Sequence, residues 1–411
     1  MNILGIDLGT SAVKAVIWQP DNGVLARGSA AVETTHPQPG FDEQDADAWW
    51  SGVQEAIANL PLDDLSAVGL SSQRETFVCL DAHAQPLRAA ILWSDGRAPS
   101  PAARFAWLQQ HEPDVARRTR WLAAPKDVVL LRLVGQLVTD TTLASRTDVE
   151  AALLPTVVEP RATVGEFHGA RVVAGAGDRA CEVLAVQATA VRPMVSWGTT
   201  ANCSLPLDGA VPAGWRASTH VDGRQLAEAG LSAAGAAIGW LGRLVGAAPG
   251  ELATLAAETP RGANGVIALP WLNGARAPWW RPDARATFLG VTSATTPGEL
   301  ARAVYEGVAH DVRRALEQLA VAPEALTIVG GGASDACWQQ ALGGITGLPL
   351  SLMHDGDAAV IGAAELALPE GVQIPPVAAG RLQPDPAAVD RYAELSRLHD
   401  AAATAVLGSL M

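Results

Sequence analysis

The chain has 411 residues, of which 49% are hydrophobic and 18% charged, so it is long enough for roughly two to four domains with buried cores. Its net charge of −14 argues against a general nucleic-acid or membrane-surface binder, because such proteins carry a basic excess. Its two lysines, Lys14 and Lys126, do not follow glycines, which excludes the GK[ST] element of a P-loop NTPase.

The first half begins with a predicted hairpin. Residues 3–6 are apolar, residues 7–11 have turn chemistry, and residues 13–18 are apolar again. Asp45 is an N-cap candidate for a helix that places Trp50, Val53, Ile57 and Leu60 on one face. Further along, the pattern predicts a buried strand over 65–71, a helix over about 127–135 and a strand from about residue 171.

The second half repeats this pattern. Residues 194–197 and 202–205 read as strands around the turn at 198–200. A helix is predicted over 297–320, with Thr296 as N-cap and Glu299 completing a capping box. A strand over 326–329 then leads into a glycine-rich turn that we expect to open another helix, and the tail is Pro-rich before a helix over 387–407. Two hairpins of one kind indicate a duplicated α/β domain with a cleft between the copies and a boundary near 187–192.

The remaining composition bears on the compartment. Four scattered cysteines without a CxxC pair argue against a disulfide scaffold or a cysteine zinc site. The N-terminus lacks a basic region and does not read as a signal peptide. The longest uncharged stretch, 336–354, contains Gln, Gly and Pro, so it is not a membrane span. We expect a cytoplasmic protein.

The first hairpin has residues suited to binding phosphate. Gly9, Thr10 and Ser11 would expose backbone N–H groups and hydroxyls to a phosphate chain, and Lys14 adds a cation. Asp7 can hold Mg²⁺, most simply through water. The alternative is an ordinary hairpin in which Asp7 caps the turn.

A second turn, Gly198-Thr199-Thr200, repeats this chemistry in the other half. Two phosphate clamps facing one another are what a phosphotransferase needs.

The segment 172–180 has the G-x-G-x-x-A form of a dinucleotide-binding turn. That motif requires an acid about 20 residues later, and none occurs between Glu182 and Asp208. Asp178 is better explained as a residue at a strand end that accepts a proton from a substrate hydroxyl. A helix-capping role for Asp178 is equally compatible with the sequence.

Other motifs suit a small polar ligand. Gln73-Arg74-Glu75 follows a buried strand and can bracket a polyol, and Trp93 and Asp95 lie downstream of it. The alternative is a surface ion pair. The turn at 330–333, which includes Gly331, Gly332 and Ala333, would let the backbone pass flat against an adenosine. The alternative is a tight strand–helix turn.

The motifs, in this order, resemble the FGGY carbohydrate kinases, which include xylulokinase, gluconate kinase and glycerol kinase. The resemblance extends from about residue 3 to residue 367. It rests on the segments at 5–11, 93–97, 125–127, 174–178, 198–200, 269–285, 302–307, 330–333 and 362–364.

The resemblance implies an α/β fold with two actin-like (ribonuclease H-like) domains and an interdomain ATP/sugar cleft. The implied parts are a sugar-binding domain over 1–188, a nucleotide-binding domain over 189–368, and a Pro-rich segment with a C-terminal helix over 369–411. It also implies that Asp178 is the catalytic base and that Asp7 organises Mg²⁺.

The motifs and the resemblance together predict three groups of site residues. Those expected to contact ATP are Gly9, Thr10, Ser11, Lys14, Gly198, Thr199, Thr200, Gly235, Gly331, Gly332 and Ala333. Those expected to contact the substrate are Gln73, Arg74, Glu75, Trp93, Asp95 and Asp178. The expected cofactors are ATP and Mg²⁺, the expected partner is a small sugar or polyol, neither a nucleic acid nor a membrane is expected, and a homodimer is the oligomer considered.

The sequence departs from the family pattern in ways that bear on the substrate. Residues 73–76 and 144–147 look like glycerol kinase, whereas 93–97 and 125–127 look like xylulokinase. Ala275 and Ala336 replace a usual acid and a usual Asn, and the chain is shorter between 147 and 171. The first expectation is a kinase of a ketopentose such as xylulose. The alternatives are a glycerol or other polyol kinase and a non-catalytic sugar- or nucleotide-binding regulatory relative.

Overall fold

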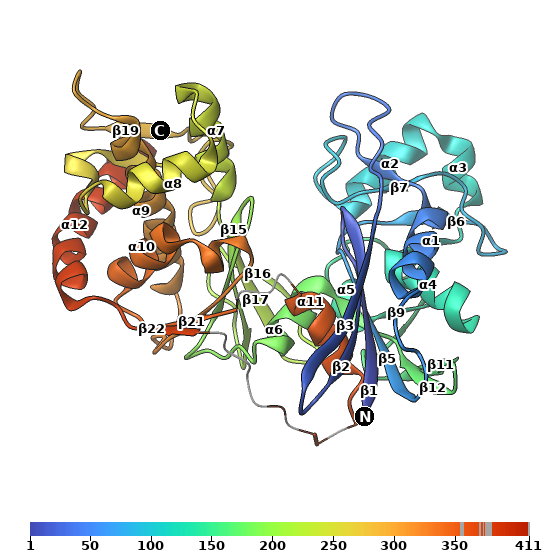
Figure 1. Ribbon diagram of the computed structural model, residues 1–411. Helices are drawn as coiled ribbons and strands as arrows, with labels where there is room; N and C mark the ends of the chain where they lie inside the picture. The colour runs from blue at the N-terminus through green and yellow to red at the C-terminus, as the bar shows by residue number, and fades with distance from the viewer. Residues whose placement is uncertain (354–356, 370, 373, 375–379, 410–411) are drawn as a thin grey trace. The chain divides into compact units, whose positions relative to one another are not determined.

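The chain forms two compact units in a computed structural model that describes residues 1–353, 357–369, 371–372, 374 and 380–409 (Figure 1). Unit 1 contains residues 1–187, 218–224 and 357–376, and unit 2 contains residues 188–217, 225–356 and 377–411. The segment 357–376 therefore belongs to unit 1, although it follows most of unit 2 in the sequence. Of the predicted Pro-rich segment, residues 370, 373 and 375–379 lie outside the described residues.

Unit 1 is built on a mixed sheet in the order β11-β12-β5-β1-β2-β3, and β13 also pairs with β5. The strands are β1 (Asn2–Leu8), β2 (Ala12–Gln19), β3 (Gly23–Ala31), β5 (Leu65–Ser72), β11 (Thr163–Phe167), β12 (Ala170–Val173) and β13 (Ala176–Gly177). The first three strands are antiparallel, whereas β1, β5 and β12 are parallel to one another. The carboxyl ends of β1, β5 and β13 consequently lie at one edge of the sheet.

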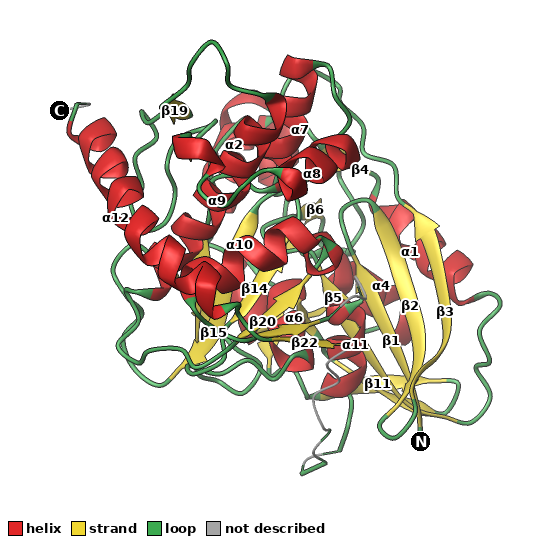
Figure 2. Cartoon of the chain, turned by 60° about the vertical axis from the view of Figure 1, so that its left-hand side comes forward, coloured by secondary structure: helices red, strands yellow, loops and turns green. Residues whose placement is uncertain are grey.

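Helices pack on both faces of this sheet. Leu4 and Ile6 of β1 face a core that includes Trp49 and Val53 of α1 (Ala46–Ile57), with α4 (Pro125–Val134) beside it. On the opposite face lie α6 (Asp178–Ala185) and α11 (Ala358–Leu366), and Figure 2 shows α11 beside β1. This packing is close, because a Cβ at Gly69 would lie only 1.8 Å from the carbonyl oxygen of Ala363.

In the described part of the chain, the rest of unit 1 consists of further helices and three small two-stranded sheets. Its helices are α2 (Pro101–His111), α3 (Pro113–Arg118), α5 (Thr141–Ala144) and the 3₁₀ turn at Ala151–Leu153. Its strands are β4 (Glu43–Gln44), β6 (Val78–Leu80), β7 (Ala90–Ile91), β8 (Trp121–Ala123), β9 (Val138–Asp140) and β10 (Thr156–Val158).

Unit 2 contains a second mixed sheet, in the order β16-β17-β15-β14-β20-β21-β22. Its strands are β14 (Met194–Trp197), β15 (Ala201–Leu207), β16 (Arg216–Thr219), β17 (Gln225–Gly230), β20 (Leu326–Val329), β21 (Leu350–Leu352) and β22 (Gly380–Leu382). From β17 to β22 the pairings are antiparallel, antiparallel, parallel, parallel and antiparallel. From β3 to β11 unit 1 has the same series, as expected for a duplicated domain.

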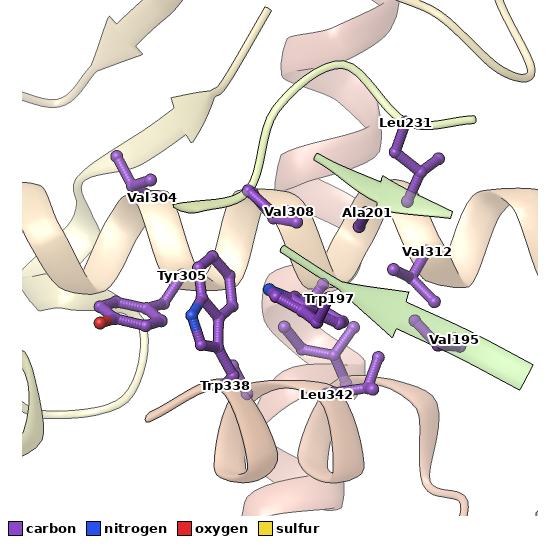
Figure 3. Close-up of a cluster of buried hydrophobic side chains, with 14 of the residues drawn as sticks. Val195, Trp197, Ala201, Leu231, Val304, Tyr305, Val308, Val312, Trp338 and Leu342 are labelled. Atoms are coloured by element: carbon purple, nitrogen blue, oxygen red, sulfur yellow. The ribbon is translucent and has the colours of Figure 1, made fainter. Parts of the chain in front are cut away.

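The core of unit 2 lies between this sheet and its helices (Figure 3). Val195 and Trp197 of β14 pack against Val308 of α9 (Pro297–Leu316) and Trp338 of α10 (Ala336–Thr346). The other helices are α7 (Gly235–Val245), α8 (Pro249–Glu258), α12 (Pro386–Gly408) and the 3₁₀ turns at Ala263–Gly265 and Gly331–Ser334. A small sheet pairs β18 (Ile267–Leu269) with β19 (Thr287–Leu289). This core supports the turn that follows β14.

The predicted mixed α/β class with two sheet-containing units is confirmed. The side chain of Asp45 caps α1, and Thr296 and Glu299 form the predicted capping box on α9. Helix α9 ends at Leu316, short of the expected residue 320. The glycine-rich segment itself forms a 3₁₀ turn, Gly331–Ser334, before α10 begins at Ala336. Within the described ranges, no helix combines the length and the apolar character needed to cross a bilayer.

Candidate active site

Asp7 lies at the end of β1, where its backbone pairs with Lys14 of β2 and Ser71 of β5. The residue is 9% exposed, and its Oδ1 has no hydrogen-bond partner among the described residues. Burial raises the pKa of Asp7 to about 7; negative Asp178 and Glu182 add to this effect, and the Ser71 hydroxyl and Lys14 oppose it. The buried, unpartnered oxygen is suited to bind a cation.

The turn after β1 is tight, because the Gly9 N–H donates to the Ala12 carbonyl at 3.1 Å. The hydroxyl of Thr10 donates to Oε1 of Gln73 at 3.2 Å and accepts the indole N–H of Trp93 at 2.9 Å. Ser11 is exposed beside it. The structure therefore brings three predicted residues together around one hydroxyl.

Lys14 extends from the second strand of the hairpin. Its Nζ lies 3.5 Å from Oδ1 of Asp357. The other oxygen of that carboxylate, Oδ2, accepts a hydrogen bond from Nε of Arg27 at 2.9 Å. The Lys14 side chain is 40% exposed, so it keeps access to solvent beside the turn.

Gln73 is buried, and both the oxygen and the nitrogen of its side-chain amide make hydrogen bonds. Its Oε1 accepts from the hydroxyls of Thr10 and Thr76, and its amide donates to Oε1 of Gln44 at 3.2 Å. Because these contacts occupy both ends of the amide, Gln73 fits the role of a brace for the turn better than that of a ligand.

Arg74 and Asp178 form an ion pair, with Nε of Arg74 donating to Oδ1 of Asp178 at 3.0 Å. Asp178 is the first residue of α6, and its Oδ1 also accepts the backbone N–H of Arg179 at 2.6 Å. The N-terminal turn of a helix favours a negative charge, which stabilises this carboxylate. Its side chain is 37% exposed and accessible to a ligand.

Glu75 has a backbone φ of 61°, a left-handed conformation that costs energy for a residue with a long side chain. Its carboxylate pairs with Arg146, and its carbonyl accepts a hydrogen bond from Nη1 of Arg104 at 2.8 Å. These two arginines stabilise the strained residue.

Arg104 is buried in α2 and links two parts of the site. Besides the Glu75 carbonyl, it donates to the carbonyl of Trp93 at 3.0 Å and to that of Ala98 at 3.1 Å. Sequence reasoning missed this residue. The signal that could have revealed it is a charged residue next to Phe105, on the face of α2 that also buries Leu108.

Trp93 and Asp95 have different surroundings. The Trp93 side chain is 52% exposed with its indole N–H anchored on Thr10, so its ring can contact a ligand. The Asp95 carboxylate is buried and bonded to Nε and Nη2 of Arg97 at 2.9 and 2.8 Å, and to the Asp42 N–H. Asp95 is thus occupied by protein partners and supports the loop.

In unit 2, the Gly198-Thr199-Thr200 turn is held by the start of α7. The N–H of Gly235 donates to the Gly198 carbonyl at 3.0 Å, and those of Ala234 and Ala236 donate to the Thr199 carbonyl. The carbonyls therefore point toward the helix, which leaves the exposed hydroxyls of the turn available to a ligand.

The glycine-rich turn after β20 packs against Trp197 at the end of β14. Gly330 has a φ of 84°, and a Cβ at Gly332 would lie 2.5 Å from Cγ of the Trp197 indole. A Cβ at Gly331 would have nothing within 4 Å, and Ala333 is buried. The predicted nucleotide residues of unit 2 thus gather around the end of β14.

The predicted site residues form one group in each unit, at the carboxyl ends of equivalent strands. Within the described part of the chain, no three His, Cys, Asp or Glu side chains form a cluster that could by itself hold a metal ion. The orphaned Oδ1 of Asp7, next to two further acids, still fits a Mg²⁺ that completes its shell with water and phosphate oxygens.

Two family models match the sequence. Residues 2–103 match the N-terminal domain of the FGGY family of carbohydrate kinases, and residues 194–369 match its C-terminal domain.

Relatives and solved structures agree with this match. The sequence is 29% identical to the xylulose kinase of Klebsiella pneumoniae and 28% identical to the glycerol kinase of Allorhizobium ampelinum, with 89% of each chain covered. The structure superposes on the "xyloylose kinase" of Brucella ovis with a TM-score of 0.92, at 26% identity over 100% of both chains. It matches the fold of the gluconate kinase of Lactobacillus acidophilus with a TM-score of 0.89, at 22% identity over 98% of both chains.

Proposed function

This chain belongs to the FGGY family of carbohydrate kinases, phosphotransferases that act on a sugar or polyol hydroxyl, and we propose that its acceptor is a ketopentose such as xylulose and its donor ATP. The observation that carries phosphoryl transfer is the geometry of Asp178, and the choice of a ketopentose rests on the similarity to a xylulose kinase. Two donors, Arg74 Nε and the Arg179 N–H, hold Oδ1, so the second oxygen of the carboxylate is the one that takes a proton.

Asp178 acts as the general base for the attacking hydroxyl. As that oxygen bonds to the γ-phosphorus, the carboxylate accepts its proton and ADP leaves. Arg74 keeps the carboxylate oriented and lies beside the proposed position of the acceptor. Glu75, held in its strained conformation, can accept from another hydroxyl, and the exposed Trp93 ring offers a face for the carbon skeleton.

Each unit has a turn with groups suited to phosphate oxygens. Thr10, Ser11 and Lys14 of unit 1, and Thr199 and Thr200 of unit 2, supply hydroxyls, N–H groups and one cation. Asp7 would hold Mg²⁺, which when bound neutralises charge on the phosphate oxygens. The turn at Gly331–Ala333 and Gly235 are proposed to line the adenosine.

A second candidate is a kinase of glycerol or another small polyol. The specific observations in its favour are the Gln73-Arg74-Glu75-Thr76 segment and the similarity to a glycerol kinase over 89% of the chain. Both candidates use the same base and differ only in the acceptor.

The test is ADP formation by the purified protein with Mg-ATP and a panel of ketoses, aldoses, polyols and sugar acids. We expect one ketopentose to be preferred and Asp178→Asn to lower turnover by about 10²–10⁴-fold while leaving ATP affinity unchanged. Asp114→Asn, the same substitution at an exposed surface acid, is the matched control.

The possible outcomes separate the candidates. Preference for glycerol would replace the ketopentose proposal with its rival. ATP binding without turnover on any acceptor would support a non-catalytic relative, and near-normal turnover of Asp178→Asn would reject the assigned base.

A further inference from the structure

The hydroxyl of Thr142 is fixed by hydrogen bonds on both sides. It accepts the backbone N–H of Gly177 at 2.9 Å and donates to Oδ1 of Asp140, and the whole side chain is buried. Gly177 is the N-cap of α6, and Asp178 follows it as the first helical residue. One hydroxyl thus holds the peptide immediately before the proposed base.

The Gly177 peptide needs this partner because of where it lies. Gly177 is buried, and a buried backbone N–H that lacks a hydrogen-bond acceptor destabilises the folded state. A side chain at 177 cannot supply the acceptor, since a Cβ there would lie 2.8 Å from Cγ and Cδ of Arg74. The stem of Arg74 therefore packs on Gly177 while its guanidinium reaches Asp178.

The acceptor of the Thr142 hydroxyl is itself rigidly held. Oδ1 of Asp140 also accepts the backbone N–H groups of Thr142 at 2.8 Å and Leu143 at 3.3 Å, and so caps α5. Its Oδ2 lies 3.0 Å from Nζ of Lys126, which in turn donates to Oδ1 of Asp127 at 2.8 Å. All three charged groups are buried.

This charge cluster is enclosed within the fold. Burial alone would lower the pKa of Lys126, but Asp127 and Asp140 outweigh burial and raise it, so the ammonium keeps its proton. Oδ2 of Asp127 accepts the Ala124 N–H at 2.9 Å. Buried ion pairs contribute little net stability compared with apolar packing, which favours a role in fixing geometry.

The same segment also reaches the proposed sugar side. Arg146, just after α5, pairs with the carboxylate of Glu75. Residues 140–146 therefore contact both the peptide before Asp178 and the strained residue at 75.

We propose that Thr142, braced by Asp140 and Lys126, is a positioning residue that sets the orientation of Asp178 for proton transfer. The inference rests on the proposed role of Asp178 as the base. Thr142 acts through the Gly177 peptide, so its loss impairs the chemical step rather than the binding of either substrate.

The test compares Thr142→Val, which removes the hydroxyl, with Thr142→Ser, which restores it. Thr346→Val is the matched control in unit 2, because that hydroxyl also accepts a backbone N–H, from Leu348, and donates to a carbonyl, that of Leu342. For each variant, kcat, both KM values, ATP affinity by calorimetry and the thermal midpoint are measured on the full chain.

We expect Thr142→Val to lower kcat by about 10–100-fold with both KM values changed by less than about threefold, and Thr142→Ser to recover most of kcat. Thr346→Val should keep the wild-type kcat whatever its thermal midpoint. Equal kcat for wild type and Thr142→Val would overturn the proposal, as would a loss in Thr142→Val that Thr142→Ser does not restore. Failure of the proposed function is distinguishable, because the wild type would then lack acceptor-dependent ADP formation or Asp178→Asn would retain it.

Discussion

Nε of Arg74 donates to Oδ1 of Asp178 at 3.0 Å, although 104 positions separate the two residues in the sequence. The Arg74 side chain is 14% exposed and that of Asp178 is 37% exposed, so the pair lies at the rim of the unit with the carboxylate outermost. The guanidinium thereby holds Oδ1, so Oδ2 is the oxygen that we propose takes the proton of the acceptor hydroxyl.

Replacing Arg74 with lysine should lower kcat/KM for the acceptor by about 10²-fold. A lysine keeps the charge but loses the planar set of donors that orients the carboxylate. Steady-state kinetics with ATP saturating measure the effect, and ATP affinity by calorimetry should stay unchanged. Arg391→Lys, at an exposed position in α12, is the control; a kcat/KM of the Arg74 variant equal to that of this control would contradict the prediction.

Glu75→Gln should raise the acceptor KM by about tenfold. The amide has one neutral oxygen in place of two charged ones as hydrogen-bond acceptors, and the ion pair with Arg146 is lost. The ATP KM should change little. Glu317→Gln, which breaks an exposed i,i+4 pair with Arg313, is the matched control. Equal increases in both KM values would indicate that the Glu75 pair is purely structural.

Gly332→Ala should destabilise the protein by about 1–3 kcal/mol, because its Cβ would press on the Trp197 ring. Gly331→Ala should retain the wild-type stability, since nothing lies within 4 Å of a Cβ there. Chemical denaturation without nucleotide measures both. Identical midpoints for the two variants would show that the turn does not rest on Trp197 in solution.

Acid should destabilise the protein through His399. Nη2 of Arg314 donates to Nδ1 of His399 at 2.7 Å, and Nε2 donates to the Ala268 carbonyl at 3.0 Å, so the ring is neutral. Burial, with Arg314 adding to it, lowers the pKa of His399 to about 3 from 6.5. Between these values the unfolded chain binds the extra proton, so stability falls as the pH is lowered.

The measurement is the free energy of unfolding at pH 7 and pH 5 for wild type and His399→Gln. The histidine accounts for a loss of about 2 kcal/mol between these pH values, which the variant should lack. The variant difference is needed because burial raises the pKa of nearby Asp311 to about 6, which has the opposite effect on stability. An identical pH dependence in both proteins would refute the assignment.

Local signals in the sequence were sufficient for much of the fold. The N-cap at Asp45 and the capping box of Thr296 and Glu299 are formed by residues close in the chain. Such motifs can therefore be recognised from the sequence alone. The pair of hairpins that open with Asp7 and Gly198 likewise predicted the repeated sheet.

The supports of the site could not be predicted in this way. Arg104 reaches Glu75 and Trp93, and Thr142 reaches Gly177, through contacts that depend on how strands and helices pack. The sequence around Gln73 and Asp95 does not show whether either residue binds a ligand or supports a loop, because each has hydrogen-bond partners that are distant in the chain. Only their hydrogen bonds to Thr10, Gln44 and Arg97 make that distinction.

The burial of Lys126 has a practical consequence for chemical labelling. The sequence contains only two lysines, and Lys126 is wholly enclosed between two aspartates, whereas the Lys14 side chain is 40% exposed. An amine-directed reagent applied to the folded protein therefore meets one reactive lysine, beside the turn proposed to hold the phosphates, in addition to the α-amino group of the exposed Met1. A fluorophore or crosslinker could be installed there without mutagenesis, and protection of Lys14 by nucleotide would map the donor site by mass spectrometry.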